Sequence, residues 1–157
     1  MLTFPRVLLL TGEWPVVRIP PPRPPPSIAK QHAAALHAAG VPVEIFAFHG
    51  GRNPWGYLAA WTRLRPRLHR GRYDVAHCDA PGTIWIALPK RVPLVVNVNA
   101  ANARSLLVRR ADAVIVASDA ERAQVRTRAP VHVIPPGLDD ALLVGRMLAV
   151  YRSIFWS

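Results

Sequence analysis

A buried strand and the start of a helix follow each other directly in Ala113-Val114-Ile115-Val116-Ala117-Ser118-Asp119-Ala120-Glu121. The first five residues are all apolar, which is typical of a short strand covered on both faces. Ser118 and Glu121 have the spacing of a capping box, in which a serine opens a helix and a glutamate three positions later completes the cap. A strand that runs straight into a helix predicts a βα unit.

The same alternation extends in both directions from this stretch. Apolar runs predict strands at residues 6–11, 43–48, 73–77, 93–98, 113–117 and 131–134. Between several of them lie segments with helical spacing and helix-start signals. Strands that alternate with helices favour a parallel sheet, so we expect an α/β, Rossmann-like, doubly wound fold.

The segments between the strands carry their own signals. Ser27 is a good N-cap for a first helix, which Gly40 ends, and the proline-rich residues 20–26 before it predict a stiff extended loop. Asn53 followed by Pro54 marks a second helix start. We expect Pro66 to kink or end that helix early. Its inward-facing residues are expected to be Leu58, Trp61 and Leu68.

The composition of the chain points to one domain with a large positive charge. Its 157 residues suffice for a single core, and half of them are apolar. The formal net charge is +11, almost wholly from arginine. Such a charge favours acidic partners such as phosphates, nucleic acid or anionic lipid. A general arginine, alanine and proline bias of the coding sequence explains the same number without any partner.

Cysteine use and hydropathy bear on the compartment. Cys78 is the only cysteine, so an internal disulfide is excluded and nothing contradicts a reducing environment. The sequence shows no secretory signal and no run of about 18 apolar residues. We therefore expect a cytoplasmic protein.

The order of these segments resembles the N-terminal domain of a GT-B glycosyltransferase of the family 4 type. The resemblance covers residues 5–139 and rests on the joint order of six stretches: Arg6–Pro15, Ser27–Val43, Gly71–His77, Val92–Val96, Arg109–Ser118 and Ile134–Asp139. It implies one acceptor-side domain at 5–139, the single N-terminal half of a GT-B fold. Residues 140–157 are then an apolar tail, a remnant of the interdomain linker, and we expect this tail to expose apolar surface and drive association.

The resemblance also implies a reaction and its participants. The complete enzyme would transfer a sugar from a nucleotide-sugar donor to an acceptor, with retention and without an essential metal or other cofactor. The donor would bind a C-terminal domain that this chain lacks, so we expect the chain alone to be inactive. The implied partners are a sugar or glycolipid acceptor and a separately encoded donor domain. Weak association with an anionic membrane surface, at the inner face, is also expected, and specific nucleic-acid binding is not.

Candidate substrate-binding residues follow from the position of the strand ends, because ligands of open α/β sheets bind outside the carboxyl ends of the strands. These residues are Gly12, Glu13, His77, Asn97, Asn99 and Ser118. Asn99 stands where the family usually has a histidine, and asparagine cannot titrate near neutral pH. No catalytic residue is therefore assigned. The adjacent His77, Cys78 and Asp79 point to alternate faces of a strand and do not predict a metal site.

Two other interpretations remain open. The chain is either a non-catalytic basic module that binds an anionic surface or nucleic acid through its arginine clusters, or an inactive truncated gene product. Four tryptophans have sugar-stacking potential: Trp14, Trp55, Trp61 and Trp85. Of these, the spacing of Trp61 and Trp85 favours core positions.

Overall fold

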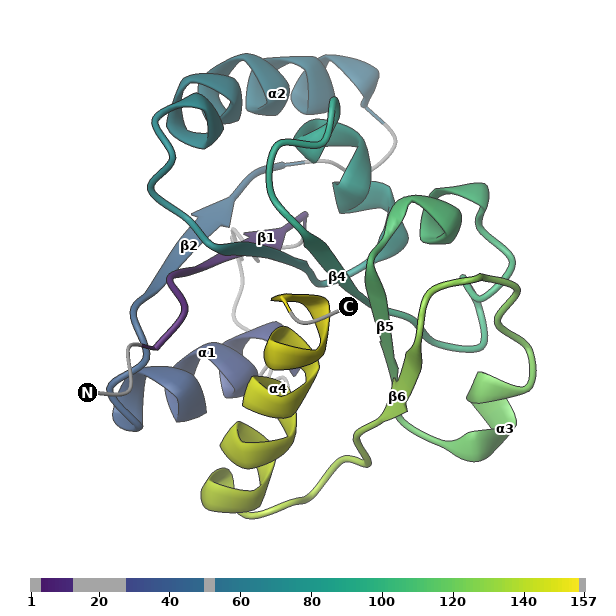
Figure 1. The fold of residues 1–157 in the computed structure, drawn as a ribbon. Helices are drawn as coiled ribbons and strands as arrows, with labels where there is room; N and C mark the ends of the chain where they lie inside the picture. The colour runs from purple at the N-terminus through teal and green to yellow at the C-terminus, as the bar shows by residue number, and fades with distance from the viewer. Residues whose placement is uncertain (1–3, 13–27, 50–52, 156–157) are drawn as a thin grey trace, which may run out of the picture.

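Six strands form one parallel sheet in the computed structural model of the chain, which describes residues 4–12, 28–49 and 53–155. The strands are β1 (Val7–Thr11), β2 (Val43–Ala47), β3 (Val75–Cys78), β4 (Leu94–Asn97), β5 (Ala113–Val116) and β6 (Val131–Val133). Their order across the sheet is β2-β1-β3-β4-β5-β6, and every neighbouring pair is parallel. The predicted α/β, Rossmann-like fold is confirmed (Figure 1).

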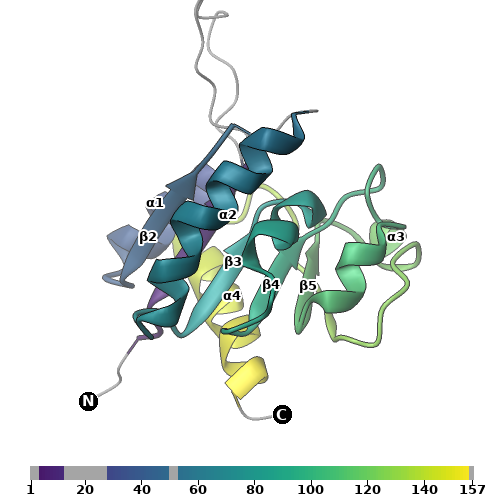
Figure 2. The ribbon, with the colours of Figure 1, turned by 90° about the horizontal axis from the view of Figure 1, so that it is seen from above.

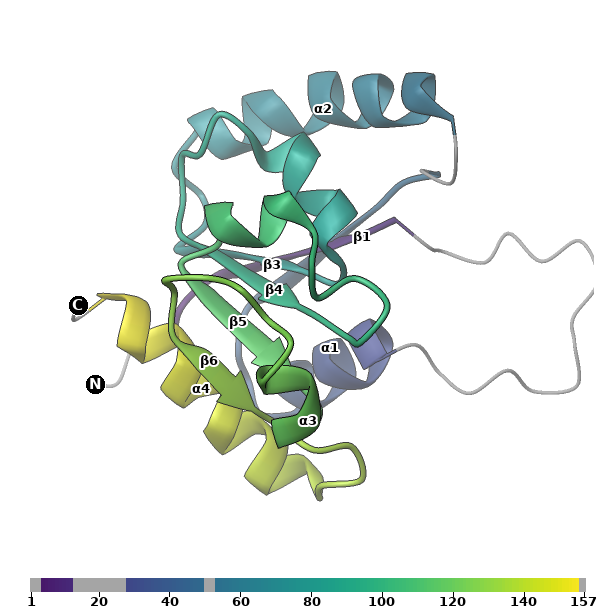
Figure 3. The same cartoon turned by 90° about the vertical axis from the view of Figure 1, so that its right-hand side faces the viewer.

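Helices cover the two faces of the sheet in two layers. The helical elements are α1 (Ile28–Ala38), α2 (Pro54–His69), η1 (Pro81–Ala87), η2 (Leu106–Arg110), α3 (Asp119–Arg122) and α4 (Asp140–Phe155), with η1 and η2 being 3₁₀-helices. Figures 1 and 3 show α2 on one side of the sheet and α1 with α4 on the other. Seen from above, α2 lies over the sheet and runs roughly along the direction of β2 and β3 (Figure 2).

Alternate residues along the strands point to opposite faces of the sheet and belong to two separate cores. Leu8, Leu10, Ala76 and Val96 pack against α2, η1 and η2. Val7, Val75, Val95 and Ile115 pack against α1 and α4. Both faces are apolar because a central parallel strand is covered on both sides.

The last helix is the largest departure from the sequence expectations. Residues 140–155 form α4, which buries Leu143, Val144, Met147, Leu148, Val150 and Tyr151 against the sheet and α1. The expectation of an apolar surface left open along this tail is wrong for these residues. Helical periodicity gives the segment one apolar side. This side packs on the sheet next to α1.

Helix α2 begins as predicted but does not end early. Oδ1 of Asn53 accepts a hydrogen bond from the Trp55 backbone N–H at 3.1 Å, which confirms the cap. The helix continues through Pro66 to His69. Proline has no N–H, so one carbonyl of the preceding turn has no partner within the helix. Pro66 is exposed, and this carbonyl therefore lies on the solvent side of the helix. Leu68 is buried as expected, whereas Leu58 is 40% exposed.

The core position expected for Trp85 is wrong, whereas the helix end expected at Gly40 is present. The segment around Ile84 is a 3₁₀-helix, and Trp85 within it is 48% exposed rather than in the core. Residues 98–112, a short connection between parallel strands, contain the 3₁₀-helix η2. Gly40 does end α1, with a φ of 78° that favours glycine.

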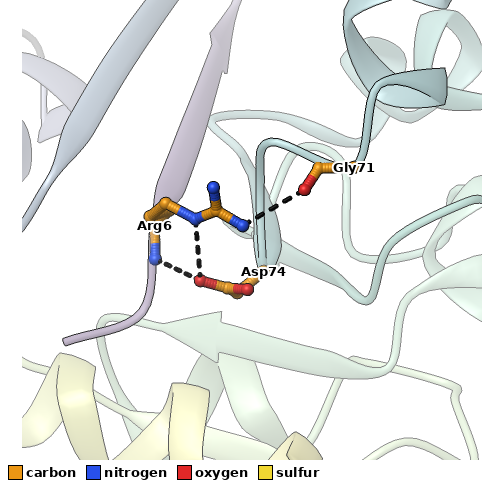
Figure 4. Close-up of polar contacts among 3 residues, drawn as sticks. All are labelled: Arg6, Gly71 and Asp74. Atoms are coloured by element: carbon orange, nitrogen blue, oxygen red, sulfur yellow. Dashed lines mark hydrogen bonds and ion pairs between the residues drawn. The ribbon is translucent and has the colours of Figure 1, made fainter. Parts of the chain in front are cut away.

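Arg6 joins the start of β1 to the turn before β3, at the end of the sheet where the strands begin. Its backbone N–H donates to Oδ2 of Asp74 at 2.7 Å, and its Nη2 donates to the Gly71 carbonyl at 3.1 Å (Figure 4). Nε of Arg6 lies 3.5 Å from the same Asp74 oxygen. These contacts fix the start of β1 to the turn before β3, so both strands enter the sheet in register.

Candidate functional site

A cavity of about 800 Å³ lies at the carboxyl ends of strands β3 to β6. Its walls come from α1, from the residues after β3 and β4, from the end of β5, from residues 134–138 and from the start of α4. Figure 3 shows these segments converging at one edge of the sheet. This is the place where open α/β sheets bind ligands.

Asn97 and Asn99 bring two amides to this cavity from the end of β4. Oδ1 of Asn99 accepts hydrogen bonds from the backbone N–H groups of Ala101 and Asn102, at 3.0 and 3.2 Å. The Asn99 N–H in turn donates to Oδ1 of Asn102 at 2.9 Å. Asn99 therefore shapes the turn after β4, and its amide oxygen is already used by that turn.

Ser118 and Glu121 cap α3 at the edge of the cavity. Oγ of Ser118 accepts from the Glu121 N–H at 3.3 Å, as the capping box predicts. The Glu121 carboxylate accepts from the Ala117 N–H at 2.8 Å, one residue earlier than in the standard box. Glu121 also lines the cavity. Its carboxylate therefore both holds this backbone turn and brings negative charge to the cavity wall.

Beneath the cavity lies a buried polar network centred on His77. Its Nδ1 is 2.8 Å from the Tyr151 hydroxyl of α4, and its Nε2 is 3.0 Å from Oδ1 of Asn97. Oδ1 of Asn97 can only accept, so the hydrogen of a neutral His77 belongs on Nε2, and Nδ1 then accepts from the Tyr151 hydroxyl. His32 of α1 lies with its ring 5.9 Å from that of His77.

Burial keeps this network uncharged. It lowers the pKa of His32 from 6.5 to about 4. The pKa of His77 is lowered to about 4, mainly by burial and to a smaller extent by the neighbouring His32. The hydrogen bond with Asn97 raises this pKa by less. Burial also raises the pKa of Tyr151. Both histidines are therefore neutral at physiological pH.

Two buried nitrogen atoms of the cavity-lining residues form no hydrogen bond in the described part of the chain. They are Nδ1 of His32 and Nδ2 of Asn97. Leaving such groups unpaired is unfavourable by about 1–3 kcal/mol each. A ligand hydroxyl that reached them would recover part of that free energy.

The charge of the cavity is opposite to that of the whole chain. Its described lining includes the carboxylates of Asp79, Glu121 and Asp140, and no lysine or arginine. The chain as a whole carries 20 lysine and arginine residues against 9 acidic ones. The basic residues thus lie away from the described walls of this cavity.

The remaining candidate residues from the sequence lie at varying distances from the cavity. His77 is fully buried one layer below it, and Ser118 is not among its lining residues. Gly12 is not among the lining residues of the cavity. A Cβ at Gly12 would lie 3.5–3.9 Å from Thr83 and Phe48, and Phe48 belongs to the core on the α2 side of the sheet. Glu13 and Trp14 lie outside the described residues. Trp55 is exposed on α2, and Nε1 of Trp61 donates to the Leu88 carbonyl at 2.6 Å.

Sequence reasoning missed two members of this site. His32 recurs with apolar residues at helical spacing, and this spacing does not distinguish a site residue from a core residue. Tyr151 lies in the segment that was expected to be a tail. The strand-end rule alone could have placed Asp79 beside Asn97, because it follows β3 directly. Among the described residues there is no group of three or more histidine, cysteine, aspartate or glutamate side chains that could hold a metal ion.

Comparison with known proteins bears on the family and the fold of the chain. The profile of Glycosyltransferase Family 4 matches residues 16–142. A solved chain of sucrose-phosphate synthase from Thermosynechococcus elongatus is similar in fold, with a TM-score of 0.68 and 18% sequence identity. The similarity covers 96% of this chain and 99% of that one. A search of curated proteins found no significant match.

Proposed function

Because the chain belongs to glycosyltransferase family 4, we propose that it serves sugar transfer by holding the acceptor sugar in the cavity at the strand ends. The observation that carries this proposal is the composition of the cavity wall. Amide, carboxylate and neutral imidazole groups surround about 800 Å³ of space, and the described wall contains no basic side chain.

The size and chemistry of the cavity suit a sugar. Ligand sites of small molecules commonly enclose about 300–1,000 Å³. Amides and carboxylates together accept from and donate to hydroxyl groups, and the apolar residues Ile115, Val116 and Leu143 offer surface to a ring. A phosphate would instead meet three carboxylates, so we propose that the bound part of the acceptor is uncharged.

The remaining features of the reaction are proposals that rest on the family. The donor is a nucleotide-sugar held by a separate domain, transfer proceeds with retention, and no metal is essential. The described cavity wall lacks the cations that would stabilise a leaving diphosphate. The role of this chain is therefore to bind and orient the acceptor, while diphosphate stabilisation falls to the donor-binding partner.

Sugar binding tests the proposal directly. Saturation-transfer NMR with a panel of neutral mono- and disaccharides should identify at least one ligand, which Asn97→Ala weakens about tenfold. The matched control is Asn53→Ala, which removes the same amide from the cap of α2, outside the cavity lining. Equal affinity of both variants, or no binding by the unaltered chain, would contradict an acceptor site in this cavity.

The partners and location proposed with this function are a sugar or glycolipid acceptor, a donor-binding domain and the cytoplasm. A glycolipid acceptor would bring the protein to the inner face of the membrane. Within the described residues no helix is long and apolar enough to cross a bilayer.

A further inference from the structure

Tyr151 of α4 directs its hydroxyl hydrogen to a single buried acceptor. The residue is fully buried and is not among the lining residues of the cavity. Its hydroxyl lies 2.8 Å from Nδ1 of His77, and within the described residues it has no other hydrogen-bond partner. Burial raises the pKa of Tyr151, so the hydroxyl keeps its hydrogen at neutral pH. A buried hydroxyl hydrogen needs an acceptor, and Nδ1 of His77 is the one within reach.

This hydrogen bond fixes the tautomer of His77. The imidazole is uncharged at neutral pH because burial lowers its pKa to about 4, so one ring nitrogen carries a hydrogen and the other accepts one. Nδ1 accepts from Tyr151, which leaves the ring hydrogen on Nε2. Nε2 lies 3.0 Å from Oδ1 of Asn97, which can only accept. Tyr151 and the Asn97 oxygen therefore require the same tautomer.

The orientation of the Asn97 amide follows from this tautomer. Oδ1 faces His77, and Nδ2 points away from it because the two atoms diverge from the same carbon. Nδ2 is buried and forms no hydrogen bond with the described residues, although Asn97 lines the cavity. A buried N–H group without an acceptor is unfavourable. The cavity wall thus holds a hydrogen-bond donor in place, and its acceptor has to come from a bound molecule.

We infer that Tyr151 and His77 are positioning residues that hold Asn97 as a hydrogen-bond donor toward the cavity, so that the acceptor sugar is recognised there through an oxygen atom. The inference deepens the proposed function and rests on it. A sugar hydroxyl that accepts from Nδ2 of Asn97 keeps its own hydrogen for a second group. The carboxylates of Glu121 and Asp140 in the cavity lining are acceptors of that kind.

The opposite orientation of the Asn97 amide would present an oxygen to the sugar. It requires the ring hydrogen of His77 on Nδ1, facing the Tyr151 hydroxyl. That hydroxyl would then have a buried hydrogen with no acceptor among the described residues. In Tyr151→Phe this penalty is absent, because phenylalanine has no hydroxyl hydrogen. Both tautomers of His77 and both orientations of the Asn97 amide should then be populated.

Nitrogen NMR of the full chain without any sugar tests the positioning. Long-range proton–nitrogen correlation spectra distinguish the two neutral tautomers of histidine, and His77 of the unaltered protein should carry its hydrogen on Nε2 alone. Tyr151→Phe should give a mixture of both tautomers. The matched control Tyr73→Phe removes another hydroxyl from a buried ring, one that bonds Glu44, and should leave the His77 signals unchanged.

Either of two results in these spectra would overturn the inference. The first is a hydrogen on Nδ1 of His77 in the unaltered protein, a criterion that needs no variant to fold. The second is an unchanged single tautomer in Tyr151→Phe, with circular dichroism verifying that the variant is folded. A merely structural Tyr151 would alter stability and leave the tautomer of His77 as it is.

Deoxy and fluoro sugars test the recognition by Asn97. The probes are the methyl glycosides of glucose, mannose and galactose with their monodeoxy and monofluoro analogues. Loss of the hydroxyl that faces Asn97 should weaken binding about tenfold in the unaltered chain and have no effect in Asn97→Ala. Fluorine accepts a hydrogen bond weakly and donates none. The fluoro analogue at that position should therefore bind at least about threefold tighter than the deoxy analogue, and Tyr151→Phe should remove this preference.

The outcomes of the sugar experiment separate this inference from the proposed function. Sugar binding in which the fluoro analogue is no better than the deoxy analogue would overturn the donor role of Asn97 and leave the acceptor site standing. Absence of binding by all three glycosides would overturn the recognition step together with the acceptor site, whatever the tautomer of His77.

Discussion

The hydroxyl of Tyr151 lies 2.8 Å from Nδ1 of His77, so the last helix is hydrogen-bonded to a central strand inside the core. Both residues are fully buried, and their rings meet edge to face at 5.9 Å. The other nitrogen of His77 contacts Asn97 at the cavity wall. Packing of α4 and the shape of the cavity are thereby connected through one imidazole.

Tyr151→Phe should lower the free energy of unfolding by about 1–3 kcal/mol, because it leaves Nδ1 of His77 buried and unpaired. Denaturant unfolding measures this change. Tyr73→Phe is the control: it removes a hydroxyl that donates to Glu44 at 2.6 Å, but the exposed Glu44 can bind water instead. A loss as large in the control as in Tyr151→Phe would contradict a special role for the buried pair.

Acid should destabilise the fold between pH 6.5 and 4. The pKa values of His32 and His77 in the folded protein are about 4, so the unfolded chain binds protons first as the pH falls. The stabilisation is complete above pH 6.5 and is lost toward pH 4. One histidine with this difference in pKa contributes about 3 kcal/mol.

The pH dependence is measured by urea unfolding at a series of pH values. His32→Gln should flatten the profile in this range, whereas His37→Gln, at an exposed position of the same helix, should not. Carboxylates contribute to every profile equally, so the difference between the variants is the informative quantity. Identical slopes in the two variants would show that His32 titrates normally.

Cys78 should be inert toward thiol reagents in the folded protein. Its side chain is fully buried, and burial raises the pKa of the thiol to about 12. Reactivity needs the thiolate, so alkylation at pH 8 should follow the rate of unfolding. Labelling by iodoacetamide with and without urea checks this. Rapid labelling without urea would show that the core around β3 opens easily.

Removal of residues 141–157 should unfold or aggregate the protein. This deletion takes away Met147 and Tyr151, which fill the core between the sheet and α1. Met147→Ala alone should lower the free energy of unfolding by about 2–5 kcal/mol. Light scattering and circular dichroism of the shortened chain provide the measurement. A monomeric, fully folded product would mean that α4 adds little to the core.

The chain alone should release no nucleotide from nucleotide-sugars. The described cavity offers no cation for the leaving diphosphate, and Asn99 cannot accept a proton. Incubation with a panel of nucleotide-sugars and the sugar ligands identified by NMR tests this expectation. Turnover that co-purifies with the protein through a further column would refute it.

The strands could be predicted from sequence because each is a short apolar run bounded by polar or turn residues. All six expected strands are present, with ends shifted by at most two residues. The helices were harder. Trp85 was placed wrongly because a 3₁₀-helix has three residues per turn, and its buried neighbours Ile84 and Ile86 leave it facing solvent.

The site could be predicted in part. Asn97 and Asn99 follow from the strand-end rule, which depends on local sequence and topology alone. His32 and Tyr151 come from helices at the two ends of the chain, and only packing shows that they meet His77. No local pattern distinguishes a histidine that faces a cavity from one that completes an apolar stripe.

The pairing of α1 with α4 has a consequence for how the protein folds during synthesis. These helices cover the same face of the sheet, yet one follows the first strand and the other follows the last. The ribosome therefore completes all six strands before α4 can cover Val75, Val95 and Ile115. Until then the nascent chain carries a bare apolar sheet face, which makes it a substrate for chaperones that bind such surfaces.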